Sequence, residues 1–270
     1  MFFRKIMKQN MTQAPIVYQS GTNIKLIHKA EYCKSIIADG KELITGDEYG
    51  EIRVPELNDE KVYITFKEEL TDFSDAFYRC LALKSIPEQL FANNAEVTNF
   101  SGTFFGCISL KSIPTGLFAN CPKVTKFSLT FYGCTALKAI PEKLFANNPE
   151  VTDFSGTFSG CTALTTIPEN LFANNPAVTD FEQTFDGCSA LKSIPTSLFD
   201  NNRKIEVLLG LFSNCTSLKG ESPYTMIGDK KVHLYERQNY PEHFTAPINF
   251  WDCFHNCTGL TDYDQIPSWK

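Results

Sequence analysis

Apolar side chains return at fixed intervals through the middle of the chain, and the interval is 27 residues. Phenylalanine, cysteine and leucine each repeat with that step, in three series that run from Phe77, Cys80 and Leu83 to Phe212, Cys215 and Leu218. Repetition at such a period is typical of stacked coils, each of which buries its apolar edge only against its neighbours. The pattern therefore predicts a repeat architecture.

The segment from Cys161 to Cys188 shows what one coil contains. A short extended run ends at Ile167, because the residue before a proline favours β or polyproline geometry. Pro168 suits the first position of a helical turn. In the second half of the coil, apolar residues at positions i, i+3 and i+7 predict one face of a helix. That series consists of Val178, Phe181 and Phe185.

The residue before each repeating cysteine is glycine in four coils and asparagine at Asn214 and Asn256. Glycine exchanging with asparagine predicts a positive φ at this position. Arg79 departs from the pattern in the first coil.

Residues 103–114, with the sequence TFFGCISLKSIP, resemble the BspA-like class of leucine-rich repeat. The pattern of that class is A/T-F-x-x-C-x-x-L-x-x-I-P, followed by V-x-x-I/F. The segment VTDFSGTF is also similar to a related repeat of bacterial surface lipoproteins. The resemblance covers about residues 70–270 and implies a right-handed solenoid in surface-exposed proteins of gut and oral bacteria, which serve adhesion or host contact. It supplies no catalytic residues.

We therefore predict an α/β fold, a right-handed leucine-rich-repeat-like solenoid of about seven 27-residue coils with a small β N-terminal cap. The expected segments are a flexible N-terminus (1–14), a β-rich cap (15–70), the repeat solenoid (71–219), and an insertion hairpin with the last coil (220–270). A separate adapter domain is the alternative for residues 15–70. Hairpins are expected around Asp39-Gly40, ending at Ile44, and around Gly228-Asp229.

The repeating cysteines are predicted to form a buried ladder of reduced thiols, which Cys257 continues. Equivalent positions on adjacent parallel coils lie about 4.8 Å apart, whereas a disulfide needs Cβ atoms about 3.8 Å apart and turned towards each other. Cys33, Cys121 and Cys253 lie outside the ladder, and the sequence leaves their state open.

Charge and composition exclude several classes of function. The net charge of −6 excludes a broad basic footprint for nucleic acid or anionic lipid. No apolar stretch is long enough for a membrane span. The Cys253-x-His255-x-Cys257 motif suggests a metal site only weakly, since four ligands are needed. We predict no metal, no cofactor and, without a catalytic motif, no enzyme.

Two surface features are candidate binding sites. Lys84, Lys111, Lys138 and Lys192 occupy one frame position, meaning the same place in the 27-residue unit, with Thr165 interrupting the series. They would form a positive stripe for an anionic glycan or acidic partner. The alternative is that these lysines only keep a sheet soluble. Aromatic residues gather around the insertion, at Tyr224, Tyr235, Tyr240 and Trp251. They would anchor a ligand, or form the core of the C-terminal cap.

The sequence thus predicts a recognition or adhesion protein that binds a protein or glycan at the bacterial surface. The alternative is a structural component of a larger assembly, such as a phage tail part or an intracellular scaffold. A cell-surface or secreted location is implied by the resemblance alone. The chain start lacks a signal-peptide pattern, which points otherwise to a cytoplasmic or virion location.

Overall fold

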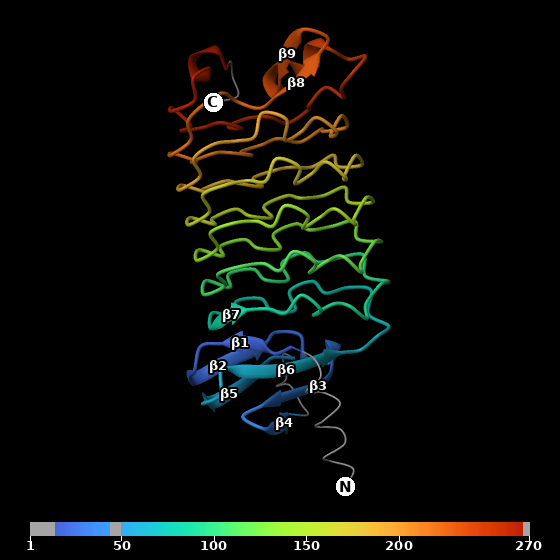
Figure 1. Ribbon diagram of the computed structural model, residues 1–270, viewed down its shortest axis with the longest axis vertical. Helices are drawn as coiled ribbons and strands as arrows, with labels where there is room; N and C mark the ends of the chain where they lie inside the picture. The colour runs from blue at the N-terminus through green and yellow to red at the C-terminus, as the bar shows by residue number, and fades with distance from the viewer. Residues whose placement is uncertain (1–13, 44–49, 267–270) are drawn as a thin grey trace.

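The computed structural model describes residues 14–43 and 50–266. From about residue 71 the chain winds in successive coils stacked along the long axis, between a sheet module at one end and a hairpin at the other (Figure 1). Single parallel bridges join equivalent residues of neighbouring coils, such as Asp72 to Asn99 and Asn99 to Lys126. We name each coil by its repeating cysteine: residues 72–98 form the Cys80 coil, 99–125 the Cys107 coil and 126–152 the Cys134 coil.

The predicted fold class is wrong. The described residues, 14–43 and 50–266, contain no α-helix, and their helical elements are short 3-10 helices: η1(Ala30–Tyr32), η2(Leu234–Asn239) and η3(Tyr263–Gln265). The sheets are small and antiparallel. The chain therefore does not form an α/β leucine-rich-repeat solenoid with helices flanking a parallel sheet. Most of the predicted flexible N-terminus, together with Ile44 and Pro267, lies outside the described residues.

The backbone of each coil shows why no helix forms. Gln183 and Gly187 have left-handed φ values of 49° and 68°, so the right-handed path breaks on both sides of Phe185. The amide of Gln183 donates to Leu209 O in the next coil at 2.8 Å, whereas the amide of Thr184 donates to Phe181 O at 3.2 Å. An α-helix needs every amide bonded four residues back. Here successive amides donate alternately to a carbonyl of the neighbouring coil and to a carbonyl three residues back in the same turn.

A leucine-rich-repeat solenoid would place the repeating leucines in one parallel sheet, and residues 14–43 and 50–266 contain no such sheet. One copy, β7(Leu83–Ser85), is a strand, and it pairs antiparallel with β1(Ile16–Tyr18). Further along, coils are linked by isolated contacts such as the Ala139–Thr166 bridge. The prediction of positive φ before the repeating cysteines is confirmed, and Arg79, with φ of 53°, shares that conformation.

The N-terminal module consists of two antiparallel sheets. Its larger sheet has the order β4-β3-β6-β1-β7 and its smaller sheet pairs β2 with β5. The remaining strands are β2(Gly21–Ile27), β3(Cys33–Ala38), β4(Lys41–Leu43), β5(Ile52–Leu57) and β6(Lys61–Phe66). The hairpin predicted around Asp39-Gly40 is confirmed between β3 and β4, with the positive φ values of 47° and 71° that a two-residue turn requires.

The module and the coils share one apolar core. Because β7 belongs to the Cys80 coil, the larger sheet extends directly onto the first coil. The ring of Phe66 lies 4.7 Å from that of Phe73 in an edge-on contact. Inside the stack, rings from successive coils lie parallel, as Phe100 and Phe127 do at 5.8 Å and 4°.

The repeating cysteines are buried, as predicted. The thiol of Cys134 donates to Phe104 O at 3.3 Å, and its neighbours bond to the equivalent carbonyls in the same way, as Cys161 does to Phe131 O. Burial raises the pKa of Cys161 to about 12, and a hydrogen bond involving the backbone of Cys134 opposes the shift. These thiols therefore stay protonated at ordinary pH.

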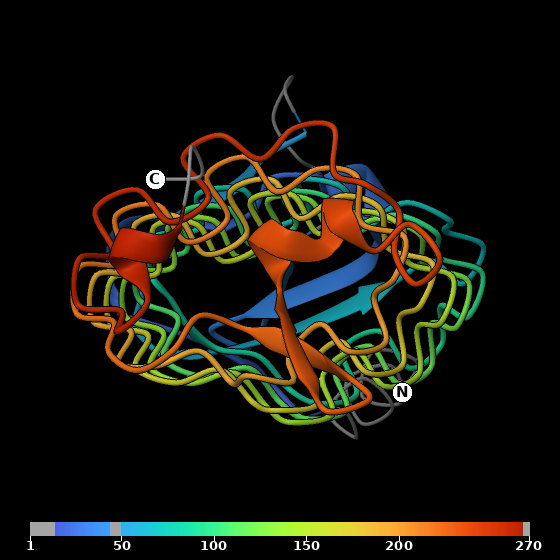
Figure 2. The same cartoon turned by 90° about the horizontal axis from the view of Figure 1, so that it is seen from above.

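The insertion hairpin predicted at Gly228-Asp229 is confirmed as β8(Tyr224–Ile227) and β9(Lys230–His233), with Ile227 paired to Lys230. Figure 2 shows the hairpin and η2 lying across the end of the stack. In this position they cover the last coils, whose core would otherwise face water.

Candidate binding surface

A cleft of about 550 Å³ lies where the N-terminal module meets the Cys80 coil. One wall consists of β2 with His28 just after it and β5 with Glu51 just before it, and the Cys80 coil forms the other wall. The side chains that give the cleft its chemistry are Lys25, His28, Glu51, Arg53, Tyr78 and Arg79.

Glu51 holds the charged wall of the cleft together. Its Oε1 accepts from Lys25 Nζ at 2.5 Å and lies 2.8 Å from His28 Nδ1, and its Oε2 accepts from Arg53 Nε at 3.0 Å. Burial alone would raise the pKa of Glu51. Hydrogen bonds from Lys25 and His28, with the charges of Lys25 and Arg53, outweigh it and lower the pKa to about 2. The Glu51 carboxylate is therefore ionised and fixes the cations around it.

Arg79 adds a cation that the fold does not require. Its backbone is left-handed, with φ of 53°, and the same frame position holds Gly106, Gly133 and Gly160 in later coils. A non-glycine residue in this conformation costs roughly 1–2 kcal/mol. Lys25, Arg53 and Arg79 face one carboxylate, Glu51, so the cleft carries an excess of positive charge.

A column of aromatic rings leads away from the cleft. Tyr78 stacks on Phe105 with ring centroids 4.9 Å apart, and Phe105 stacks on Tyr132 at 4.5 Å. Later coils hold small or polar residues at this frame position, namely Ser159, Asp186 and Ser213. The stack of coils therefore folds without rings here.

Exposed aliphatic side chains occur in the same three coils as the aromatic column. Leu81, Ile108 and Leu129 are exposed by 47%, 46% and 41%. The frame position of Leu81 and Ile108 holds polar residues in later coils, namely Thr135, Thr162, Ser189 and Thr216. Leu129 has a left-handed φ of 56°, a true outlier for a bulky residue.

We call the six residues Tyr78, Leu81, Phe105, Ile108, Leu129 and Tyr132 the apolar patch. They all belong to the Cys80, Cys107 and Cys134 coils, and two of them, Tyr78 and Leu81, also line the cleft. Contiguous exposed apolar surface rimmed by polar groups marks binding sites in soluble proteins.

The predicted lysine stripe forms a column across the coils. Lys111, Lys138 and Lys192 are exposed, whereas Lys84 is half-buried and its Nζ lies 2.5 Å from Glu60 Oε1. The amide of Lys111 donates to Lys84 O at 3.2 Å, which places the two residues on adjacent coils in register. A binding role for this column remains a prediction.

Charge reversal of three of these lysines is expected to leave the fold intact. Because Lys111, Lys138 and Lys192 are exposed, the triple glutamate variant should change the free energy of unfolding by no more than about 0.5 kcal/mol per site. Thermal denaturation followed by circular dichroism measures this. A loss as large as that of a core substitution would show that the lysines pack against the coils.

The predicted aromatic residues of the insertion do not form one exposed surface. Tyr235 is 7% exposed and stacks on His233 at 5.1 Å, while Trp251 is 59% exposed. Tyr224 and Tyr240 are half-buried, and Lys231 Nζ lies 4.4 Å from the ring of Tyr224. Of the four, Trp251 alone is exposed.

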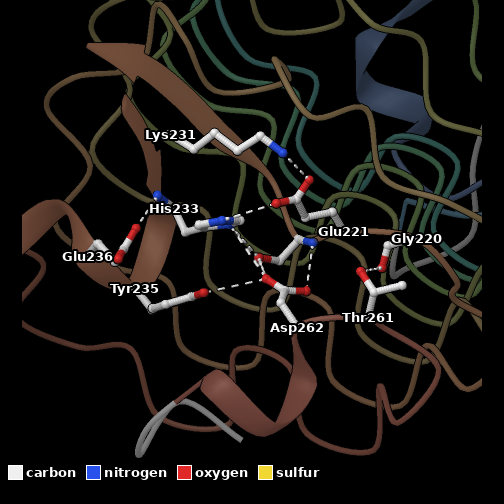
Figure 3. A network of polar contacts seen from close by, with 9 residues as sticks. Gly220, Glu221, Lys231, His233, Tyr235, Glu236, Thr261 and Asp262 are labelled. Atoms are coloured by element: carbon white, nitrogen blue, oxygen red, sulfur yellow. Dashed lines mark hydrogen bonds and ion pairs between the residues drawn. The ribbon is translucent and has the colours of Figure 1, made fainter. Parts of the chain in front are cut away.

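A polar network joins the insertion to the last coil, as Figure 3 shows for His233, Asp262 and their neighbours. Ser222 Oγ donates to Asp262 Oδ2 at 2.5 Å and lies 2.9 Å from His233 Nδ1, which is itself 3.5 Å from Asp262. A catalytic triad places the serine and the carboxylate on opposite nitrogens of the imidazole. Here Ser222 and Asp262 both lie at Nδ1, and Glu221 Oε1 lies 3.4 Å from the opposite nitrogen, Nε2. Ser222 is fully buried, however, and its hydroxyl already donates to Asp262, so no substrate reaches it. The network therefore fastens β9 to the chain end and offers no nucleophile.

Other classes of site find little support in residues 14–43 and 50–266. No group of three or more His, Cys, Asp or Glu side chains there could hold a metal ion. Cys253 and Cys257 are buried, while the His255 side chain is 48% exposed. In the same part of the chain, no helix is long and apolar enough to cross a membrane.

Comparison with known proteins gives no family for this chain. No protein-family model matches the sequence, and no curated protein matches it.

The sequence reasoning missed both the cleft and the apolar patch. The signal for the patch was present in the repeat, as departures from the consensus at three frame positions: rings at 78, 105 and 132, aliphatic residues at 81 and 108, and a leucine at 129. Within the repeats, the predicted binding residues were the lysines, which recur with the repeat, whereas the apolar patch consists of residues that depart from it.

Proposed function

We propose that the protein recognises a macromolecular partner, without catalysis, through the apolar patch and the adjoining cleft. One observation carries the proposal. Four of the six patch residues, Leu81, Ile108, Leu129 and Tyr132, are exposed. All six stand at frame positions where later coils carry small or polar residues, so stacking of the coils does not account for them. Exposed apolar side chains that folding does not need are typical of interfaces.

Display at the bacterial surface is part of the proposal and is supported by the resemblance of residues 103–114 to BspA-like repeats. In that setting the partner is a host protein or glycan, and binding serves adhesion. The lysine column and Trp251 stay as further predicted contact residues.

Two substitutions that restore the repeat are expected to remove binding and keep the fold. Ile108→Thr introduces the residue found at Thr135 and Thr162, and Leu129→Gly introduces the residue found at Gly102 and Gly156. Because Leu129 is left-handed, glycine there relieves about 1 kcal/mol of backbone strain. We expect the double variant to melt no lower than the wild type and to lose its signal on an array of host proteins and glycans.

The matched control makes equivalent changes away from the patch. Gln183→Gly falls at the frame position of Leu129, and Thr162→Ser at that of Ile108. This control should retain the array signal, and the lysine triple variant tests the other candidate surface in parallel. An unchanged signal for the patch variant would refute the proposal. No signal even for the wild type would favour the structural-component alternative.

A further inference from the structure

We propose that the cleft holds a carboxylate of a protein partner, and that apolar side chains next to that carboxylate in the partner's sequence lie on the apolar patch. The ligand is thus an acidic peptide segment with apolar residues close by. This inference rests on the proposed function, because it names the partner for the same surface.

The charges of the cleft select an anion. Glu51 already engages Lys25, His28 and Arg53, and Arg79 reaches the cleft from the opposite wall. The Lys25 side chain is only 7% exposed, and charges in such partly enclosed sites interact more strongly than in open water. Guanidinium groups bind carboxylates through two parallel hydrogen bonds. A carboxylate from a partner therefore fits the remaining positive charge.

The composition of the patch favours a peptide over a glycan. Sugars bind aromatic side chains through the face of the ring, but the faces of Phe105 are covered by Tyr78 and Tyr132. The ring of Tyr78 also contacts that of His28, with ring centroids 5.5 Å apart. The aliphatic side chains of Leu81 and Ile108 are exposed beyond these stacked rings, and aliphatic surface suits apolar side chains of a peptide.

The length of the apolar patch sets how far apart the acidic and the apolar residues of the ligand can be in its sequence. From Tyr78 at the cleft to Tyr132 at the far end there are two ring-to-ring steps of 4.9 and 4.5 Å. An extended chain advances about 3.3 Å per residue, so about three residues cover this length. The acidic and the apolar residues of the ligand are therefore separated by about three residues or fewer.

The side chains at two left-handed positions support a role beyond folding. Arg79 and Leu129 both hold left-handed conformations at positions where neighbouring coils use glycine. Gln183 holds the same conformation at the frame position of Leu129, so the coil itself imposes it. What distinguishes Arg79 and Leu129 is that a cation and an exposed leucine occupy such positions beside the cleft and in the apolar patch. Arg79 lies at the charged end of the proposed contact, and Leu129 lies at its apolar end.

The test selects ligands from a random peptide library displayed on phage, with the full chain immobilised. We expect enriched sequences to combine Asp or Glu with Leu, Ile or Phe within about three residues. A synthetic copy of an enriched peptide is then titrated by fluorescence anisotropy against four proteins: the wild type, Arg79→Gly, Asn214→Gly and the double variant Ile108→Thr, Leu129→Gly. Its affinity should fall about tenfold or more for Arg79→Gly, because a charged hydrogen-bonded contact is lost.

Asn214→Gly is the matched control. Asn214 occupies the same frame position as Arg79 and has a φ of 60°, but it lies in a coil far from the cleft. It should bind as the wild type does, and binding to both should weaken with added salt. Enriched peptides without acidic residues, or equal affinity for Arg79→Gly, would overturn the inference.

The two proposals fail in different ways. If the Ile108→Thr, Leu129→Gly variant loses binding while Arg79→Gly binds fully, the inferred carboxylate contact is refuted. The proposed function is then still supported. Unchanged binding in both variants removes both proposals. An acidic glycan that binds in an Arg79-dependent way, with no peptide enriched, would replace the peptide by a glycan and overturn the inference.

Discussion

Phe145→Ala is expected to lower the free energy of unfolding by about 3–5 kcal/mol, the range for removing a buried phenylalanine. Phe145 is fully buried in the middle of the stack. Its ring lies 4.7 Å from the rings of Phe127 and Phe154, and it stacks between Phe118 and Phe172 at 6.2 and 6.3 Å. Urea unfolding followed by circular dichroism measures the change.

The position of Phe145 makes the effect larger than a local defect. Each coil contacts only its neighbours, so a cavity here weakens the connection between the two halves of the stack. Phe145→Leu is the control, because it keeps most of the apolar volume and should cost less than the alanine variant. A loss below about 1 kcal/mol for Phe145→Ala would show that the rings on either side close the gap.

The sequence predicted the features that local chemistry decides. The period of 27 residues, the burial of the repeating cysteines and the turns at Asp39-Gly40 and Gly228-Asp229 are all present. Left-handed backbone before those cysteines was read from glycine and asparagine alone. In each case a residue's own conformational preference or apolar character is enough to determine the outcome.

The fold class failed because one spacing fits two structures. Val178, Phe181 and Phe185 lie on one face of a helix, but all three are equally buried when the chain makes successive short turns. The acceptors of the backbone amides decide between a helix and successive short turns. The amide of Phe181 donates to Val207 O, which lies in the next coil. Such a partner is set by the stacking of coils and is not encoded within one coil.

The candidate site was only partly accessible from the sequence. The cleft brings together Lys25 from β2, Glu51 from just before β5 and Arg79 from the Cys80 coil. These residues share no sequence motif. The apolar patch could have been found by comparing coils with one another, since Ile108 stands where Thr135 and Thr162 follow. Residues that recur in every coil are needed for folding. A candidate binding site is therefore better sought among residues that differ between coils.

A ladder of asparagines shows how the stack ends. Asn175 Nδ2 donates to Phe145 O and to Asn148 O of the preceding coil, at 3.1 and 2.8 Å. Asn148 and Asn202 bond to the equivalent carbonyls in the same way. These bonds satisfy backbone acceptors inside the core, where an unpaired carbonyl would be costly.

Arg237, in the insertion, supplies the next step of this ladder. Its Nη2 donates to Phe199 O and its Nη1 to Asn202 O, both at 2.9 Å, so the guanidinium serves the two carbonyls that a further asparagine would serve. The ring of Phe244 lies 4.3 Å from its central carbon. Burial lowers the pKa of Arg237 to about 9, a shift that the charge of Asp200 opposes.

Arg237→Ala is therefore expected to destabilise the C-terminal end by about 2–4 kcal/mol, because three charge-assisted hydrogen bonds, to Phe199 O, Asn202 O and Thr225 Oγ1, are lost. Phe199 O still accepts from the amide of Asn202, whereas the buried Asn202 carbonyl loses the donor that Arg237 supplies. Hydrogen exchange should show the loss in β8, β9 and η2 before the central coils, since stability in stacked repeats is local. Arg203→Ala is the control, because Arg203 is exposed and only its backbone carbonyl, which accepts from the amide of Thr245, is engaged. Equal exchange rates in the two variants would show that the insertion is held by its apolar contacts and that the ladder ends at Asn202.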